Sequence, residues 1–135
     1  MKFKKGKLYA LSNPLWGNNI LKLGNTSQTI KSRLSTIHTS LYLDCKIVYQ
    51  TEDLICCKYF EKILEKILAS YRIKREFYLV LEEEIKEIYD FFNQLNDCLG
   101  NEENLIKYIE KYNPEYLLNK KKLKKKKGLF VDTSY

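Results

Sequence analysis

Two short apolar runs near the N-terminus constrain the fold of this chain more than any other feature. Residues 8–11 (Leu-Tyr-Ala-Leu) and residues 20–23 (Ile-Leu-Lys-Leu) are each four residues long, which is typical of strands. Pro14 and Gly17 lie between the two runs and are strong turn signals. The pattern predicts an antiparallel hairpin with a loop long enough to reach a ligand.

Segments with helical spacing alternate with further strand-like runs downstream of this hairpin. Apolar residues recur every three or four positions in residues 30–41, 60–71 and 85–95, which predicts three amphipathic helices. The acidic Thr51-Glu52-Asp53 segment is expected to open the second helix, because carboxylates stabilise a helix N-terminus. Residues 45–49 are predicted to form a third strand and residues 76–80 a further short one.

This order of elements predicts an α+β (α/β) fold. We expect a small mixed, mainly antiparallel sheet of about three strands flanked by helices, in the order β-β-α-β-α-(β)-α, plus a C-terminal helical extension. The expected organisation is one domain over residues 1–97, a helical extension over residues 98–119 and a lysine-rich, disordered tail over residues 120–135.

The net charge of +7 is distributed unevenly along the chain. Residues 1–75 hold 14 Lys or Arg against 5 Asp or Glu, whereas residues 76–119 hold 3 against 11. The basic front of the molecule can face a polyanion and the acidic middle cannot. Nucleic acid is therefore the expected partner, and a charge-balanced domain with a solubilising tail is the alternative.

Several classes of protein and site are not expected from the composition. No apolar run approaches the roughly 20 residues of a membrane span, and no signal-peptide stretch follows the basic N-terminus. We expect an intracellular protein of the cytoplasm, or of the nucleus if the host is eukaryotic. The four cysteines form no C-x-x-C pair and His38 is the one histidine, which argues against structural zinc.

Four side chains on the predicted elements carry the chemistry needed to cleave a phosphodiester. Tyr9 and Lys22 lie on the hairpin, Arg33 on the first helix and Glu61 on the second. A carboxylate can hold a divalent metal ion, and an arginine binds the phosphate oxygens on which negative charge builds in the transition state. A phenol or an amine can take a proton from the attacking water.

The order of these pieces resembles the GIY-YIG nuclease superfamily, and most closely its branch in phages and large DNA viruses. The resemblance rests on the Leu8-Tyr9 strand, the stretch at residues 22–26 (Lys-Leu-Gly-Asn-Thr), the Arg33-Leu34 pair, Phe60-Glu61 and residues 72–77. It covers residues 6–95, and it implies the fold and the metal-dependent nuclease activity of that superfamily.

The resemblance also implies roles for individual residues. Tyr9 matches the tyrosine of the first motif, the general base or its partner, and Gly24 the glycine of the second motif, where a side chain would crowd the cleft. Arg33 matches the phosphate-binding arginine, and Glu61 the glutamate that holds Mg²⁺ or Mn²⁺. Lys22 replaces the tyrosine of the second motif, a replacement that is frequent in this branch.

Two further residues are assigned supporting places. Thr26 is expected to line the cleft or to cap the helix that follows it. Glu76 is expected to support the site if it reaches the cleft, and otherwise to form an ion pair at the sheet edge. The Arg33 side chain is expected at the border of its helix's buried face, directed into the same cleft.

The tail is expected to act as a nucleic-acid arm, as a nuclear address, or as a solvated segment without a role. Its basic residues are Lys120, Lys121, Lys122, Lys124, Lys125, Lys126 and Lys127. The sequence thus predicts a single-metal DNA endonuclease without a nucleotide cofactor, with a protein partner as a candidate source of specificity. A catalytically inactive nucleic-acid-binding module and a protein-interaction domain are the alternatives.

Overall fold

The structure is a computed structural model that describes residues 3–27 and 45–118. The chain divides into two compact units, residues 1–100 and residues 101–135. The second unit contains the helix α4 (Glu102–Tyr112), whose N-terminus is capped by the Asn101 side chain. None of the helices in the described ranges is long and apolar enough to cross a membrane.

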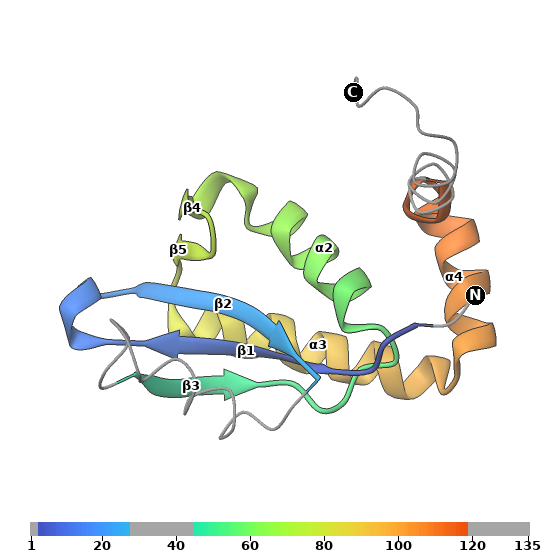
Figure 1. Cartoon of the computed structure of the whole chain (residues 1–135), viewed down its shortest axis with the longest axis horizontal. Helices are drawn as coiled ribbons and strands as arrows, with labels where there is room; N and C mark the ends of the chain where they lie inside the picture. The colour runs from blue at the N-terminus through green and yellow to red at the C-terminus, as the bar shows by residue number, and fades with distance from the viewer. Residues whose placement is uncertain (1–2, 28–44, 119–135) are drawn as a thin grey trace, which may run out of the picture. The chain divides into compact units, whose positions relative to one another are not determined.

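The described part of the first unit is built on a five-stranded sheet with the strand order β3-β1-β2-β5-β4 (Figure 1). The strands are β1 (Lys7–Ser12), β2 (Ile20–Thr26), β3 (Lys46–Gln50), β4 (Arg72–Lys74) and β5 (Phe77–Leu79). Every pairing is antiparallel. The α+β class and the mainly antiparallel sheet are therefore confirmed, although the sheet has five strands where about three were expected and all its described pairings are antiparallel.

The predicted hairpin is confirmed, and its register decides which side chains share a face of the sheet. Tyr9 pairs with Gly24 and Leu11 with Lys22, so these four residues lie on one face. Leu8, opposite Asn25, points to the other face. The loop between the strands is tightened by a 3₁₀ turn, Pro14–Trp16, capped by the side chain of Asn13.

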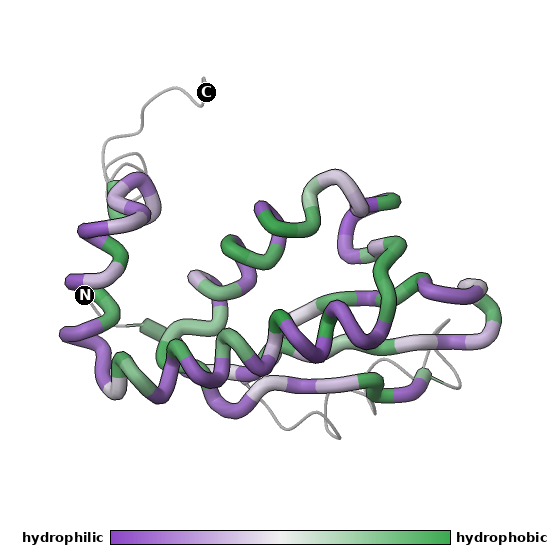
Figure 2. Tube along the Cα trace, turned by 180° about the vertical axis from the view of Figure 1, so that it is seen from behind, coloured by the Kyte–Doolittle hydropathy of each residue, from purple (hydrophilic) through white to green (hydrophobic). Residues whose placement is uncertain are grey.

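Two helices, α2 (Cys57–Ile67) and α3 (Glu82–Leu99), cover the face to which Leu8 points, and Figures 1 and 2 show both on the same side of the sheet. The rings of Phe60 and Phe92 join the two helices, with their centroids 5.2 Å apart. The buried Tyr89 hydroxyl donates a hydrogen bond of 3.1 Å to the backbone oxygen of Tyr9. These contacts fix α2 and α3 against the hairpin that carries the candidate site.

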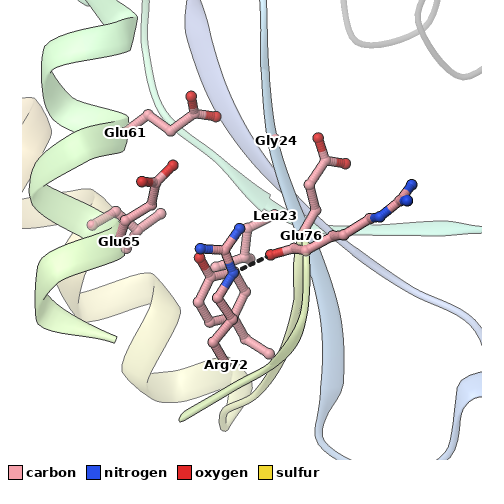
Figure 3. A pocket seen from close by; sticks show the side chains of 9 residues that line it. Leu23, Gly24, Glu61, Glu65, Arg72 and Glu76 are labelled. Atoms are coloured by element: carbon pink, nitrogen blue, oxygen red, sulfur yellow. Dashed lines mark hydrogen bonds between the residues drawn. The ribbon is translucent and has the colours of Figure 1, made fainter. Parts of the chain in front are cut away.

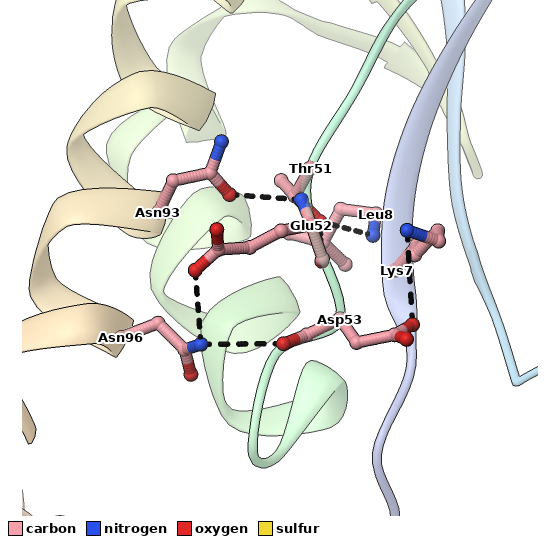
Figure 4. Close-up of polar contacts among 7 residues, drawn as sticks. All are labelled: Lys7, Leu8, Thr51, Glu52, Asp53, Asn93 and Asn96. Carbon is pink, nitrogen blue, oxygen red and sulfur yellow. Dashed lines mark hydrogen bonds and ion pairs between the residues drawn. The ribbon is translucent and has the colours of Figure 1, made fainter. Parts of the chain in front are cut away.

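Helix α2 begins at Cys57 and not at Thr51, so the expectation that Thr51-Glu52-Asp53 opens it is wrong. The Thr51 hydroxyl accepts a hydrogen bond from the backbone N–H of Leu8, and the side chains of α3 hold the segment from the other side (Figure 4). Two backbone N–H groups, those of Glu52 and Ile55, donate to side-chain oxygens of Asn93 and Asn96. These donors are bound outside the segment, and no helix forms before Cys57 in the segment.

In the β4–β5 hairpin, strand β5 corresponds to the short strand predicted at residues 76–80, whereas the sequence does not predict β4. The three residues of β4, Arg-Ile-Lys, are all exposed and show no apolar alternation, so the segment resembles a basic connection. Its turn is made by Arg75 and Glu76, and Arg75 has a φ of 50°, in the left-handed region that glycine or asparagine usually occupies. Backbone pairing with β5, and not side-chain pattern, makes this segment a strand.

Candidate functional site

A cavity of about 150 Å³ lies where the pairing between β2 and β5 ends. The ladder ends at Lys22, and the backbone N–H of Leu23 makes one further bond, of 2.9 Å, to the carbonyl of Glu76. The cavity opens next to Gly24, between α2 and the β4–β5 hairpin (Figure 3). We call it the edge cavity. Among the residues that line it are Leu23, Gly24, Glu61, Glu65, Arg72 and Glu76.

Three of the sequence-predicted site residues, Gly24, Glu61 and Glu76, line the edge cavity. Glu61 comes from α2, and Figure 3 shows its carboxylate directed from the helix into the space beside Gly24. Glu61 is half-buried, because it lies beside the apolar stripe of α2 that contains Phe60 and Leu64. The sequence leaves open whether this carboxylate points outward or lines a site, and the structure places it in the cavity.

The side chain of Asn25 holds the Glu61 carboxylate. Its amide nitrogen donates a hydrogen bond of 2.7 Å to Oε2 of Glu61, across 36 residues of chain. The Cys57 thiol donates to the amide oxygen of Asn25 at a sulfur–oxygen distance of 3.9 Å. The thiol thereby favours the amide orientation in which the N–H group, not the oxygen, faces the carboxylate. Sequence reasoning missed Asn25, although it directly follows Gly24.

The pKa of Glu61 is raised above its ordinary value. Burial is the main cause, because removing the carboxylate from water disfavours its charged form. The hydrogen bond from Asn25 opposes this shift, while the negative charges of Glu65 and Glu76 add to it. A cation entering the edge cavity would favour the ionised form of Glu61.

Tyr9 lies behind Gly24, on the opposite face of the sheet, and is not among the residues that line the edge cavity. Its buried ring lies across Gly24, so that a methyl group built on Gly24 would be 2.5 Å from the phenol oxygen. The same ring packs with Leu11, and Trp16 and Ile47 close over them. Because Gly24 itself lines the cavity, the missing side chain at this position lets the phenol approach the cavity from behind β2.

Lys22 is connected to the edge cavity through Glu76. The Lys22 amine lies 3.4 Å from the Glu76 carboxylate, and the lysine side chain is 8% exposed against 56% for the glutamate. Lys22 is therefore a buried strand residue that is paired with Glu76 at the β4–β5 turn. Glu76 forms the expected ion pair at the sheet edge and also lines the cavity.

Thr26 and the remaining predicted residues lie elsewhere. Thr26 is buried at the end of β2, opposite Lys7, and is not among the residues that line the edge cavity. Arg33 and the lysine tail, residues 120–127, lie outside the described residues. The structure adds Glu65, Arg72 and Arg75 to the residues that line the cavity. Of these, Glu65 could have been found from the sequence, because it lies four residues, or one helical turn, after Glu61.

Metal-binding capacity in the described residues is limited to isolated carboxylates. No group of three or more His, Cys, Asp or Glu side chains in the ranges 3–27 and 45–118 is arranged to hold a metal ion. Glu61 uses Oε2 for Asn25, and within these ranges its Oε1 has no hydrogen-bond donor. This arrangement fits an ion that takes one protein carboxylate and completes its shell with water and substrate.

Fold and site together define a small α+β domain with a carboxylate-containing cavity at the edge of an antiparallel sheet. Residues 6–93 match the T5orf172 domain, which is well over half of the chain. The chain therefore belongs to the T5orf172 domain family, a domain found in phage-related proteins associated with GIY-YIG-like nucleases. Neither a curated protein nor a solved structure matches the chain.

Proposed function

We propose that the protein is a metal-dependent endonuclease that hydrolyses DNA phosphodiester bonds by the single-metal chemistry of GIY-YIG enzymes. The observation that supports this most is the Glu61 carboxylate in the edge cavity, held by Asn25 beside the side-chain-free Gly24. Membership of the T5orf172 family is consistent with a nuclease-like, DNA-binding module. The basic balance of residues 1–75 favours a polyanionic substrate.

The donor set at Glu61 fits Mg²⁺ or Mn²⁺. Magnesium is usually bound through one or two carboxylates, several waters and the phosphates of the substrate, and not by a cage of protein ligands. A bound ion at Oε1 of Glu61 would neutralise the phosphate and stabilise the leaving oxygen. Asn25 would keep the carboxylate oriented in the absence of substrate.

The other predicted site residues would bind the phosphate and accept the proton of the attacking water. Water attacks phosphorus, a new phosphorus–oxygen bond forms, and the bond to the leaving sugar oxygen breaks. Tyr9, whose phenol lies over Gly24, is the proposed acceptor for the proton of that water, and Lys22 is the alternative. Arg33 binds the non-bridging phosphate oxygens, as the superfamily resemblance implies, and Glu76 orients the Lys22 amine.

A nicking assay with matched variants tests this proposal. Supercoiled plasmid is incubated with the protein and Mg²⁺ or Mn²⁺, and conversion to the relaxed form is followed over time. Glu61→Gln and Tyr9→Phe should lose about 10²-fold or more in rate. Glu65→Gln is the matched control, since it makes the same change one helical turn away in the same cavity. Nicking that persists in both site variants would exclude the proposed active site.

A second function, nucleic-acid binding without cleavage, is favoured by one observation. No group of three or more His, Cys, Asp or Glu side chains in the described residues is arranged to hold a metal ion, and the Lys22 amine is already paired with Glu76. Salt-sensitive retardation of DNA by a protein that never nicks plasmid would identify this function. A protein-interaction role through the acidic residues 76–119 would instead leave DNA unbound at low salt.

A further inference from the structure

Arg72 is a cation of the edge cavity that is not paired with a carboxylate of the described residues. It enters from β4, and Figure 3 shows its guanidinium directed toward the α2 side of the cavity, where Glu61 and Glu65 lie. Yet it forms no ion pair within 4.0 Å with any carboxylate of the described residues. Lys22, by contrast, is occupied by Glu76.

The Arg72 guanidinium is nevertheless held in place. Its Nε donates to the backbone carbonyl of Arg75, and its charged carbon lies 5.8 Å from the centroid of the Tyr78 ring. These contacts use one of the five N–H donors of the side chain and leave four on the two terminal nitrogens. An arginine fixed by its Nε and stacked on an aromatic face loses little entropy when the terminal nitrogens bind a ligand.

The backbone at Arg75 is consistent with this arrangement. The turn between β4 and β5 needs a residue with positive φ, and Arg75 provides it at 50°, where glycine or asparagine would be less strained. The carbonyl of this strained residue is the group that holds Arg72. Arg75 also lines the edge cavity, so the turn contributes two cations to a space that contains three glutamates.

The ligand that best fits the free N–H donors of the Arg72 guanidinium is an oxyanion. Four donors in a planar fork match the non-bridging oxygens of a phosphodiester, and a fork also discriminates against a simple halide ion. A cavity of about 150 Å³ exceeds by several-fold the roughly 10–15 Å³ that a single water needs, so an oxyanion and waters fit together. Arg72 and Glu61 line this same space from opposite elements.

The geometry points to Arg72 as a phosphate-binding residue of the edge cavity, which holds a DNA phosphodiester against the β4–β5 hairpin while Glu61 faces it from α2. This inference rests on the proposed function and adds a binding residue to it. Arg72 contacts the substrate from the side of the sheet edge, independently of Arg33. Its role is to bind and orient the strand, and it takes no part in proton transfer.

The test compares Arg72→Ala and Arg72→Lys with Lys74→Ala in the full-length protein. Lys74 is the matched control, because it lies on the same strand, is exposed and carries the same charge, but does not line the cavity. Binding of a short fluorescent DNA duplex is measured by anisotropy over a series of salt concentrations. Thermal unfolding of each variant shows whether the fold is kept, and Arg72→Lys retains the stem and charge if Arg72→Ala does not fold.

Arg72→Ala should weaken DNA binding roughly ten-fold or more and reduce the slope of log K against log salt by about 0.9, the value of one phosphate contact. Arg72→Lys should bind between Arg72→Ala and the unmodified protein, because it keeps the charge without the fork. Lys74→Ala should stay close to the unmodified protein. Equal effects of Arg72→Ala and Lys74→Ala, or no effect of either, would overturn the inference.

The two assays distinguish a failure of the proposed endonuclease function from a failure of the phosphate-binding role of Arg72. If the unmodified protein binds DNA through Arg72 but never nicks plasmid, the endonuclease is excluded and the phosphate-binding residue stands. If it nicks plasmid and Arg72→Ala both binds and cleaves normally, the enzyme stands and the role of Arg72 is refuted. If the unmodified protein does not bind the duplex even at low salt, both are refuted.

Discussion

The contact between Tyr9 and Gly24 yields a quantitative prediction. A methyl group on Gly24 would lie 2.5 Å from the Tyr9 phenol oxygen, 2.7 Å from Cζ and 3.1 Å from Cε1. Favourable contacts between carbon atoms lie at about 3.5–4.0 Å, so the ring would have to move by roughly 1 Å. The ring is 2% exposed and packs against Leu11, which leaves it little room to move. Gly24→Ala should therefore overpack this part of the domain.

A double-mutant cycle isolates the size of the clash. Overpacking costs about 1–3 kcal/mol, while alanine gains about 0.5–1 kcal/mol over glycine inside a strand. Gly24→Ala alone should therefore destabilise the protein by about 0.5–2 kcal/mol. In a Tyr9→Leu background, where the side chain ends before it reaches Gly24, the same change should stabilise by about 0.5–1 kcal/mol. The difference between the two backgrounds is the clash itself, about 1–3 kcal/mol.

Urea unfolding of the four proteins of the cycle measures this difference, provided the slope with denaturant stays constant. Tyr9→Phe serves as an intermediate background, since it removes the phenol oxygen but keeps Cζ at 2.7 Å from the added methyl group. An identical effect of Gly24→Ala in the unmodified protein and in the Tyr9→Leu background would refute the reasoning. If the clash displaces the phenol from the edge cavity, Gly24→Ala should also slow plasmid nicking without changing Glu61.

Three further predictions concern groups around the edge cavity and the start of α2. The pKa of the Glu61 carboxyl is raised in the folded state, so the folded protein binds the carboxyl proton more tightly than the unfolded chain does. The free energy of unfolding should therefore fall as the pH rises from the pKa of Glu61 in the unfolded chain to its pKa in the folded protein. Glu61→Gln should remove that loss, as urea unfolding at acidic and neutral pH would show, and equal pH profiles would contradict it. Asn25→Ala should weaken Mn²⁺ binding about 10-fold or more, measured by titration calorimetry, whereas Asn18→Ala in the hairpin loop should leave it unchanged. Asn96→Ala leaves the Ile55 N–H without its acceptor and should destabilise the protein by about 1–3 kcal/mol in urea, against a small effect for Asn104→Ala.

The sequence predicts those parts of the fold whose side-chain pattern is tied to burial. The β1–β2 hairpin is marked by two short apolar runs whose central residues are buried on both faces of the sheet, and the stripe of α2 follows the period of three to four residues because the helix buries one face. Strand β4 carries no such pattern, since its three residues are exposed and only backbone bonds to β5 define it. The predicted start of α2 is wrong because Asn93 and Asn96, some 40 residues away, take the N–H groups that would have begun the helix.

At the candidate site, too, the sequence indicates which residues to consider but not which residues contact them. Glu61 and Gly24 are identified from motif order, which fixes their elements but not their neighbours. The amide that orients Glu61 comes from Asn25, and the thiol that orients this amide comes from Cys57. Each of these contacts spans more than 30 residues and depends on how α2 crosses β2, which no local spacing encodes.

The end of the β2–β5 ladder connects these observations. If β5 continued alongside Gly24 and Asn25, its backbone would occupy the edge cavity, and Glu61 would face a strand and not a ligand. The turn at Arg75 and Glu76 stops the ladder after Leu23, and it delivers both Arg72 and the partner of Lys22 to the resulting gap. The residue with positive φ, Arg75, thus lies where the sheet ends and the edge cavity begins. Replacing Arg75 by glycine should relieve the strain and stabilise the hairpin while weakening DNA binding, a combination that a purely structural turn would not show.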